Sequence, residues 1–174
     1  MSIVDDMDEI YFAGGCFWGI EHYFKQIDGV ISTEVGYANG NTEHPTYEEV
    51  YTDTTGYAEC VKVVYNPLII TLEYLVELFF RSIDPLSLNR QGNDCGTRYR
   101  TGVYYTDSRD VAQIKSIFDI VEKSVGELLA VELAPLKKFY LAEEYHQDYL
   151  DKNPNGYCHI PTELMMMARL ANKK

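Results

Sequence analysis

Gly14-Gly-Cys-Phe-Trp-Gly19 is the stretch on which the organisation of this chain depends. It follows Glu9–Ala13, a short apolar run of the strand type, and the glycine pair ends that run with a turn. After Cys16 the apolar residues recur at helical spacing, which predicts a helix that starts near Cys16 and ends at Gly29. A cysteine therefore lies where a strand, a glycine turn and a helix meet.

This position favours a reactive thiol at Cys16. The free N–H groups of a first helical turn, together with the positive end of the helix dipole, stabilise a thiolate. Glycines allow the backbone to approach a substrate closely, and Phe17 and Trp18 place an apolar wall beside the sulfur. The alternative is a buried, inert cysteine at a tight turn, as most free cysteines are. The turn context favours the reactive reading.

Outward from this motif, strands and helices interleave irregularly. Further strands are expected at Val30–Tyr37, Ala58–Tyr65, Gly102–Tyr105 and Leu128–Leu133. Amphipathic helices are expected at Leu72–Ile83 with Thr71 as N-cap, at Val111–Val121 before Gly126, and at Ala142–Leu150 before Asn153-Pro154. Asn39–Pro45 and Asn89–Thr97 are expected to be loops, and the C-terminal tail is loop-like apart from a possible short helix at Leu164–Leu170. The pattern predicts a single α+β domain with a mixed sheet and helices packed on it.

Composition narrows the class of protein. The chain has 174 residues, enough for one domain, and 46% apolar with 24% charged residues is typical of soluble globular proteins. The formal net charge of -12 argues against nucleic acid and against an anionic membrane surface, because both need a basic face. Met1–Glu9 is acidic and lacks the regions of a signal peptide, and no apolar run reaches the roughly 20 residues of a membrane span. We expect a cytoplasmic protein.

The cysteines point to redox chemistry and not to a structural framework. There are four, Cys16, Cys60, Cys95 and Cys158, and they are widely spaced with no CxxC pair. Without a secretory signal they are not expected to form disulfide crosslinks, and their spacing does not suit a zinc site. We expect no metal.

Glu59 is the second informative residue. In the expected strand Ala58–Tyr65 side chains alternate, so Glu59 shares a face with Val61 and Val63, whereas Cys60 and Lys62 lie on the other. If the Glu59 face is buried, desolvation raises the pKa of the carboxyl, and it can act as a general acid at neutral pH. The alternative is a strand-end glutamate that bends out to solvent.

Several further segments are ordinary when taken singly. Pro45-Thr-Tyr-Glu-Glu-Val50 contains Tyr47, and the polar loop Asn93–Arg100 contains Asp94 and Tyr99. His146 lies on the apolar face of the expected helix at Ala142–Leu150, where a core histidine is more common than a catalytic base.

In combination these segments resemble the A-type peptide methionine sulfoxide reductases. Gly14-Gly-Cys-Phe-Trp-Gly19 resembles the signature of that family, and the resemblance runs in the same order from about Ile10 to His159. The other matching segments are Pro45–Val50, Gly56-Tyr-Ala-Glu59, Asn89–Asp94, Gly96–Arg100, Tyr145–Leu150 and Lys152–Cys158. The resemblance implies the α+β roll of the family, as one domain over residues 1–174 with a core at 10–159 and a tail at 160–174.

The resemblance also implies a role for each matching residue. Cys16 is expected to be the nucleophile, and Phe17 and Trp18 are expected to cradle the methyl group of the substrate. The residues expected to bind the sulfoxide oxygen are Tyr47, Glu59 and Tyr99, with Glu59 supplying the proton and Asp94 supporting the site by hydrogen bonding. The rim is expected to contain Tyr149 and Tyr157, and Cys158 is expected to be the resolving thiol.

The implied activity is reduction of methionine sulfoxide, free or in proteins and in its S epimer, to methionine. Oxygen passes to Cys16 as a sulfenic acid, which condenses with a second thiol to a disulfide. A dithiol protein, thioredoxin or glutaredoxin, then restores the enzyme by exchange, with no metal, flavin or nucleotide. The chain departs from the family pattern at Tyr57, where the usual residue is His. Its Gly156–Ile160 segment resembles relatives in which a B-type domain follows, and since nothing large follows here we expect no B-type activity.

Alternatives remain open at this stage. Cys16 could belong to a redox sensor that oxidises without turnover, although an oxygen-binding set of Tyr47, Glu59 and Tyr99 suits only the reductase. A cysteine hydrolase with His22 or His146 as base is disfavoured, because neither histidine lies in a motif that marks it as one. Cys95, or an external thiol, is the rival to Cys158 for resolving the sulfenic acid.

Overall fold

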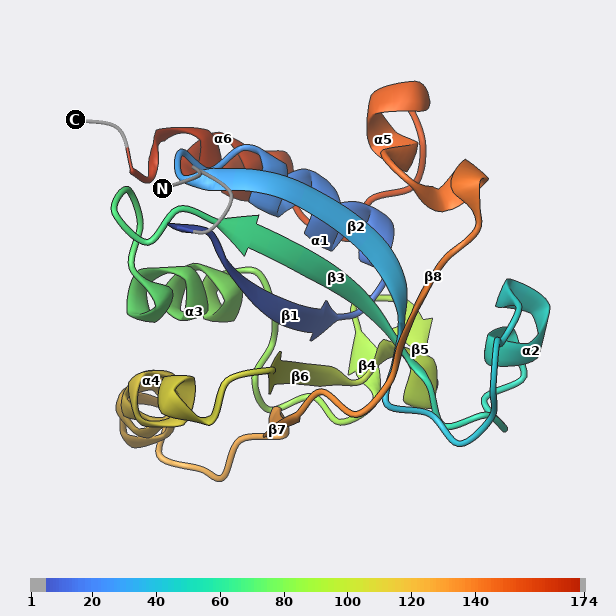
Figure 1. The fold of residues 1–174 in the computed structure, drawn as a ribbon, viewed down its shortest axis with the longest axis horizontal. Helices are drawn as coiled ribbons and strands as arrows, with labels where there is room; N and C mark the ends of the chain where they lie inside the picture. The colour runs from blue at the N-terminus through green and yellow to red at the C-terminus, as the bar shows by residue number, and fades with distance from the viewer. Residues whose placement is uncertain (1–5, 173–174) are drawn as a thin grey trace.

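The structure is a computed structural model, and it describes residues 6–172. Five residues of the acidic N-terminal segment, 1–5, and the last two of the tail, 173–174, lie outside the described residues. A six-stranded sheet in the order β7-β6-β1-β3-β2-β8 forms the centre (Figure 1). Its strands are β1 (Asp8–Gly14), β2 (Val30–Ala38), β3 (Ala58–Tyr65), β6 (Thr101–Tyr105), β7 (Glu132–Pro135) and β8 (Phe139–Leu141). All neighbours are antiparallel except β6 and β7, so the expected mixed sheet is confirmed.

Helices cover one face and the ends of this sheet. They are α1 (Phe17–Lys25), α2 (Tyr47–Tyr51), α3 (Leu72–Arg81), α4 (Val111–Val125), α5 (Tyr149–Lys152) and α6 (Thr162–Leu170). In Figure 1, α1 runs along β2 and β3, α3 and α4 lie together at the left, and α2 and α5 lie at the right. The Tyr74 hydroxyl of α3 donates to the Ala171 carbonyl just after α6, which fixes the C-terminal helix to the body of the protein. No described helix is long and apolar enough to cross a membrane.

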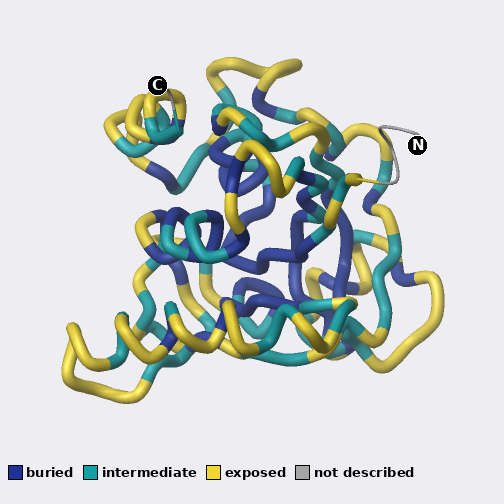
Figure 2. The backbone as a smooth tube through the Cα atoms, turned by 60° about the vertical axis from the view of Figure 1, so that its left-hand side comes forward, coloured by how far each residue is buried: buried dark blue, intermediate teal, exposed yellow. Residues whose placement is uncertain are grey.

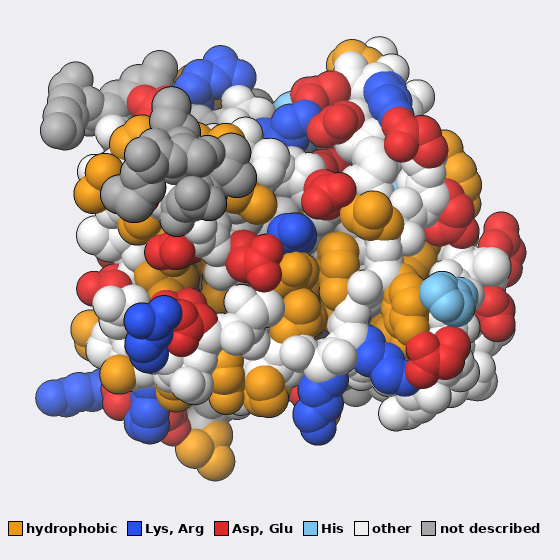
Figure 3. All heavy atoms as spheres, in the orientation of Figure 1, with side chains coloured by type: hydrophobic (Ala, Val, Ile, Leu, Met, Phe, Trp, Pro, Cys, Tyr) orange, Lys and Arg blue, Asp and Glu red, His pale blue; other side chains and the backbone are white. Residues whose placement is uncertain are grey.

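The sheet has two buried faces of unequal size. The larger core packs apolar side chains of β1, β2, β3 and β6 against α1, α3 and α4, and it contains Phe12 stacked between Phe24 and Phe79. The smaller one includes Tyr11, Cys60 and Tyr104, and Leu136 and Phe139 of the β7–β8 segment pack on it. Figure 2 shows the buried residues gathered in the interior and the exposed ones around the outside, and Figure 3 shows hydrophobic side chains along the sheet.

Strand pairing brings the key residues to one end of the sheet. β1 pairs antiparallel with β3 and with β6, so the end of β1 lies beside the starts of both. The end of β2 joins them, since Tyr37 pairs with Glu59 and Ala38 pairs with Ala58. A small hairpin of β4 (Arg90–Gln91) and β5 (Asp94–Cys95), followed by a 3-10 turn at Thr97–Tyr99, lies close to the same end.

Most predicted elements are present, but several differ in position or were not predicted. Helix α1 ends at Lys25, before Gly29, and the strand expected at Leu128–Leu133 is β7, shifted toward the C-terminus. The polar stretch Asn89–Thr97 contains the β4–β5 hairpin, and neither α2 nor β8 was predicted. The short helix expected near Leu164–Leu170 is confirmed as α6.

The helix predicted over Ala142–Leu150 is wrong. The segment forms a 3-10 turn at Glu144–His146 and then the separate helix α5. Gln147 is extended and Asp148 has a left-handed φ of 54°, so no continuous helix passes through them. Gln147 accounts for the break, because its side chain bonds to both backbone groups of Val35 on β2.

Candidate active site

Cys16 lies at the end of the glycine turn and is the N-cap residue of α1, as the sequence predicts. Its side chain is buried, with 6% exposed. Gly15 has a φ of 86°, and a Cβ there would lie 2.8 Å from the Cβ of Gln91. Both the backbone conformation and the crowding therefore require glycine at this position, and the turn delivers Cys16 to the sheet end.

Glu59 lies on the buried face of β3, only 2% exposed. Its Oε1 accepts a hydrogen bond of 3.1 Å from the backbone N–H of Phe17, the first residue of α1. Burial raises the pKa of Glu59 to about 8, although the Phe17 N–H and the nearby Arg98 lower it. The carboxyl is therefore mostly protonated at neutral pH, and the alternative of a solvent-facing glutamate is wrong. Lys62, on the opposite face, faces Glu9.

The thiol of Cys16 responds to two opposing influences. Burial, and then the charge of Glu59, raise its pKa well above the usual value, whereas the N–H groups of Trp18 and Gly19 lower it. The stabilisation of the thiolate expected from the helix start is thus present but is outweighed by desolvation. A protonated Glu59 carries no charge and does not repel a thiolate. Protonation of Glu59 and ionisation of the Cys16 thiol therefore favour each other.

A cavity of about 60 Å³ lies in front of these two groups. Eight of the ten residues singled out by sequence line it, and they come from six separate parts of the chain. The lining residues are Cys16, Phe17, Trp18, Tyr47, Glu59, Asp94, Tyr99 and Tyr157. Only Tyr149 and Cys158 of the ten lie outside the lining, and each contacts a residue of α1 instead.

The phenols in this cavity are neutral hydrogen-bond donors. Burial, with the charge of Glu59 second, raises the pKa of Tyr47 to about 12 and that of Tyr99 further. Tyr157 donates from its hydroxyl to Asp94 Oδ2 at 3.0 Å, which ties the C-terminal segment to the β4–β5 hairpin. The cavity thus presents one thiol, one neutral carboxyl and phenol hydroxyls.

An aromatic wall closes the other side of the cavity. Trp18 stacks on Tyr149 with ring centroids 3.7 Å apart, and its Nε1 donates to His146 Nδ1 at 3.0 Å. His146 is buried, and burial lowers its pKa, so the ring is neutral. Its bond to Trp18 fits the predicted core histidine and not a base for Cys16.

Cys158, in the segment between α5 and α6, packs against Gly19 of α1, one helical turn from Cys16. A Cβ on Gly19 would lie 3.3 Å from Cys158 Sγ and 3.0 Å from His159 Nδ1, so the missing side chain of Gly19 makes room for this segment. Residues three apart on a helix are neighbours. The Nε2 of His159 bonds to the Gly14 carbonyl at 3.0 Å. Cys158 also lines a larger hollow of about 430 Å³ between α1, α5 and α6.

The other two cysteines are placed differently. Cys60 is fully buried on the smaller core face, on the opposite side of β3 from Glu59. Cys95 is exposed in the β4–β5 hairpin, where it pairs with Arg90. Asp94 lines the cavity, and successive strand side chains alternate, so Cys95 is directed away from it.

The sequence reasoning missed residues that hold the aromatic groups in place. Glu143 accepts from the hydroxyl of Tyr37 at 2.8 Å and from the backbone N–H of Tyr47 at 2.9 Å. Asp53 accepts from the backbone N–H of Arg98 at 3.0 Å and pairs with its guanidinium, which lies 4.4 Å from the Tyr99 ring centre. No periodicity marks these carboxylates, because they act across loops.

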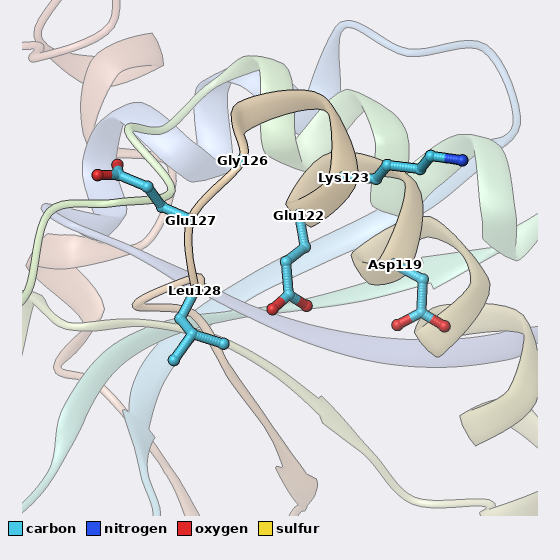
Figure 4. A pocket seen from close by; sticks show the side chains of 6 residues that line it. All are labelled: Asp119, Glu122, Lys123, Gly126, Glu127 and Leu128. Atoms are coloured by element: carbon cyan, nitrogen blue, oxygen red, sulfur yellow. The ribbon is translucent and has the colours of Figure 1, made fainter.

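A further hollow, close in volume to the one that Cys158 lines, lacks the side chains that the Cys16 cavity offers. It lies at the C-terminal end of α4 and is lined by Asp119, Glu122, Lys123 and Gly126–Leu128. Figure 4 shows Asp119 and Glu122 pointing to one side of α4 while Lys123 points away. No cysteine, histidine or aromatic residue lines it. Within residues 6–172, no cluster of His, Cys, Asp or Glu side chains is suited to hold a metal ion.

A buried cysteine that faces a neutral carboxyl, two phenols and an apolar wall defines the class of thiol oxidoreductases that act on a small polar group beside an apolar one. Comparison with known proteins places the chain within that class. The sequence profile described as peptide methionine sulfoxide reductase matches residues 8–174. The chain is 56% identical over 159 residues to the peptide methionine sulfoxide reductase MsrA of Clostridium acetobutylicum, covering 91% of this chain and 98% of that one.

Solved structures agree. Mxr1 from Saccharomyces cerevisiae in reduced form is 41% identical with a TM-score of 0.84, covering 88% of this chain and 90% of that one. Mxr1 in complex with Trx2 is 28% identical with a TM-score of 0.61, covering 86% and 88%. The chain therefore belongs to the peptide methionine sulfoxide reductase family, in its A-type branch.

Glu59→Gln should stabilise the protein, and more so at higher pH. In the unfolded chain the carboxyl ionises near its usual value of 4.5, whereas in the folded chain it stays protonated to about 8. Folding therefore takes up a proton between these values, and the stability contribution of Glu59 falls as the pH rises through this window. Glutamine keeps an acceptor for the Phe17 N–H and has no proton to take up.

Urea unfolding of both proteins between pH 4.5 and 8.5 checks this expectation. The stability gain of Glu59→Gln should be near zero at the acid end and reach on the order of a few kcal/mol at the basic end. A gain that does not depend on pH would mean that Glu59 titrates normally in the folded protein. Glu73→Gln on α3 is the matched control, because the same substitution is made at a glutamate that is not fully buried.

Proposed function

We propose that this enzyme reduces methionine sulfoxide by attack of Cys16 on the sulfoxide sulfur while Glu59 protonates the leaving oxygen. The observation that carries the proposal is the buried, protonated carboxyl of Glu59 in one small cavity with the Cys16 thiol. A thiolate is a soft nucleophile suited to sulfur. Phe17 and Trp18 supply the apolar surface that a substrate methyl group needs.

The oxygen of the substrate gains negative charge as the S–O bond weakens. Donors already in place stabilise such charge in a site that excludes water. Tyr47 and Tyr99 supply phenol hydroxyls, and Asp94 fixes the rim through Tyr157. Attack forms a bond between the Cys16 sulfur and the substrate sulfur while Glu59 gives its proton to the oxygen. The hydroxyl then passes from the substrate sulfur to the Cys16 sulfur as the bond between the two sulfurs breaks, and methionine leaves. Cys16 retains the oxygen as a sulfenic acid.

Cys158 then resolves the sulfenic acid. Its thiol attacks Cys16, a disulfide forms, and the oxygen leaves as water with the proton of the thiol. Cys158 is supported by its place against Gly19, one turn of α1 from Cys16. Cys95 is disfavoured because it is directed away from the cavity, and Cys60 because it lies behind the strand.

A dithiol protein completes the cycle by reducing the disulfide. The solved complex of the related Mxr1 with Trx2 supports a thioredoxin in this role, and glutaredoxin is an alternative donor. The electrons then come from outside the chain, so the chemistry needs no metal, flavin or nucleotide within it. We place the enzyme in the cytoplasm, which the four unpaired cysteines support. The expected substrate is the S epimer, free or in proteins.

A redox sensor is the alternative that shares the nucleophile. It needs a reactive thiol but no acid or donors for a departing oxygen. The protonated Glu59 between Tyr47 and Tyr99 therefore favours the reductase. Turnover of a sulfoxide substrate with dithiothreitol separates the two, because a sensor that lacks an acid and donors for the departing oxygen does not reduce the sulfoxide. Assays with each sulfoxide epimer separately test the expected stereochemistry.

Cys16→Ser should abolish turnover and leave the fold intact. A serine oxygen is a poor nucleophile toward sulfur and cannot hold the transferred oxygen, and loss of a nucleophile typically costs many decades of rate. Steady-state assay with dithiothreitol measures the effect, and circular dichroism confirms folding. Cys60→Ser is the control and should keep nearly full activity. Residual activity above about a tenth of wild type would exclude Cys16 as nucleophile.

Glu59→Gln should slow the reduction step by roughly 10²–10⁴-fold, the contribution typical of a general acid. The loss should shrink at low pH if hydronium can replace the missing acid. Single-turnover measurement of sulfoxide consumption isolates this step from disulfide exchange. Tyr47→Phe and Tyr99→Phe should each cost less and the double variant much more, because the two phenols share one oxygen. Wild-type kinetics in Glu59→Gln would remove it from the mechanism.

One equivalent of methionine sulfoxide should convert the reduced protein to a Cys16–Cys158 disulfide, identified by thiol blocking and peptide mapping. Gly19→Ala should slow this conversion, because the added methyl would lie 3.3 Å from Cys158 Sγ and displace its segment. Methionine release in the first turnover should change little. A Cys16–Cys95 peptide, or a lasting sulfenic acid with Cys158 free, would contradict the assignment.

A further inference from the structure

Glu21 is a buried acidic side chain that the proposed mechanism does not use. It lies on α1 and only 2% of it is exposed. Both oxygens are engaged: Oε1 accepts from the backbone N–H of Asp148 at 2.8 Å, and Oε2 accepts from the Thr33 hydroxyl at 2.9 Å. A buried carboxyl is costly unless it is hydrogen-bonded. Its two bonds join α1 to β2 and to the segment before α5.

The residue that Glu21 holds has an unusual backbone. Asp148 has a φ of 54°, in the left-handed region. A residue other than glycine persists in this region only where its surroundings hold it there. Two side chains of α1 do so, since Glu21 accepts from its N–H and Lys25 donates to its carboxylate. The conformation of Asp148 therefore depends on α1.

Asp148 directly precedes Tyr149, the first residue of α5. Tyr149 stacks on Trp18 with an angle of 9° between the rings. Trp18 and Glu21 are three residues apart on α1 and so lie on the same side of that helix. The Glu21–Asp148 contact is thus the neighbour of the Trp18–Tyr149 stack, and both join the same two segments.

We propose that Glu21 is a positioning residue of this enzyme: through Asp148 it fixes Tyr149, and through Tyr149 it fixes the Trp18 wall of the substrate cavity. Glu21 does not touch the reacting atoms. The effect on turnover rests on the proposed function, whereas the effect on Trp18 is a property of the protein without substrate.

This role requires a side chain at position 21 that is long enough to accept a hydrogen bond from the Asp148 N–H. Burial raises the pKa of Glu21 to about 7, with the charge of Asp148 acting in the same direction and that of Lys25 in the opposite one. When protonated, the carboxyl can still accept from Asp148 and turn its hydrogen to Thr33. Glutamine can also bond both partners, because its amide oxygen can accept from the Asp148 N–H and its amide nitrogen can donate to the Thr33 hydroxyl oxygen. Methionine has a similar volume but no acceptor for the N–H, and aspartate keeps the charge but is one carbon too short.

Trp18 is the single tryptophan of the chain, so its fluorescence reports the wall directly. In Glu21→Met, acrylamide should quench Trp18 more strongly than in wild type, because the stack with Tyr149 loosens. Glu21→Gln should match wild type. Glu21→Asp should change in the same direction as Glu21→Met, and it serves if the methionine variant does not fold.

Kinetics give the second readout. For Glu21→Met and Glu21→Asp the KM for methionine sulfoxide should rise about tenfold, as for loss of one buried hydrogen bond, with kcat changed much less. Glu21→Gln should restore the wild-type KM. Thr33→Val leaves the Asp148 contact intact and is the matched control, with near wild-type quenching and KM.

Two results would overturn the inference. One is wild-type quenching and KM in the folded Glu21→Met or Glu21→Asp protein. The other is a glutamine variant as impaired as the methionine variant, which would make the charge and not the acceptor the required feature. If wild-type protein reduced no sulfoxide, the proposed function would fail, yet the quenching series would still decide the role of Glu21.

Discussion

The hydrogen bond from the Phe17 N–H to Glu59 is the interaction on which the rest of the site depends. It joins the first residue of α1 to the start of β3, and it supplies a partner for a carboxyl that is otherwise removed from water. Burial keeps that carboxyl protonated, and the short connection through Phe17 keeps it beside Cys16. The Glu59 carboxyl and the Cys16 thiol are thereby held in one cavity.

The same device recurs around the cavity. Glu143 accepts from the backbone N–H of Tyr47, Asp53 from that of the residue before Tyr99, and Glu21 from that of the residue before Tyr149. In each case an acidic side chain holds the backbone next to an aromatic ring. Part of the acidic excess of the chain thus serves to place uncharged rings.

The sequence indicated the residues that line the cavity better than the residues that hold them in place. Strand alternation placed Glu59 and Lys62 on opposite faces of β3, but only the structure shows that the Glu59 face is the buried one. The glycine turn was enough to place Cys16 at a helix start. The same local rules failed at Ala142–Leu150, where apolar spacing suggested one helix. The break there comes from Gln147 bonding to β2, more than a hundred residues away in the chain. Long-range bonds of this kind leave no periodic signal.

For the cysteines, too, the sequence predicted some properties and only the structure shows the others. The pKa of Cys16 could not be predicted from its helix position, because desolvation opposes the helix amides and depends on the complete cavity. The alternation of side chains along β3 alone was enough to place Cys60 on the opposite face from Glu59. The preference for Cys158 over Cys95 gained physical support only when Gly19 was seen against the C-terminal segment.

The attachment of the C-terminal helix has a mechanical consequence. The segment that carries Cys158 runs between α5, which is tethered to α1, and α6, whose end is tethered to Tyr74. This segment is held at both ends, so the distance over which it can move is limited. If Cys158 resolves Cys16 as proposed, the length of this segment sets how closely the two sulfurs can approach, and an insertion or deletion in it would change the rate of disulfide formation without altering either cysteine.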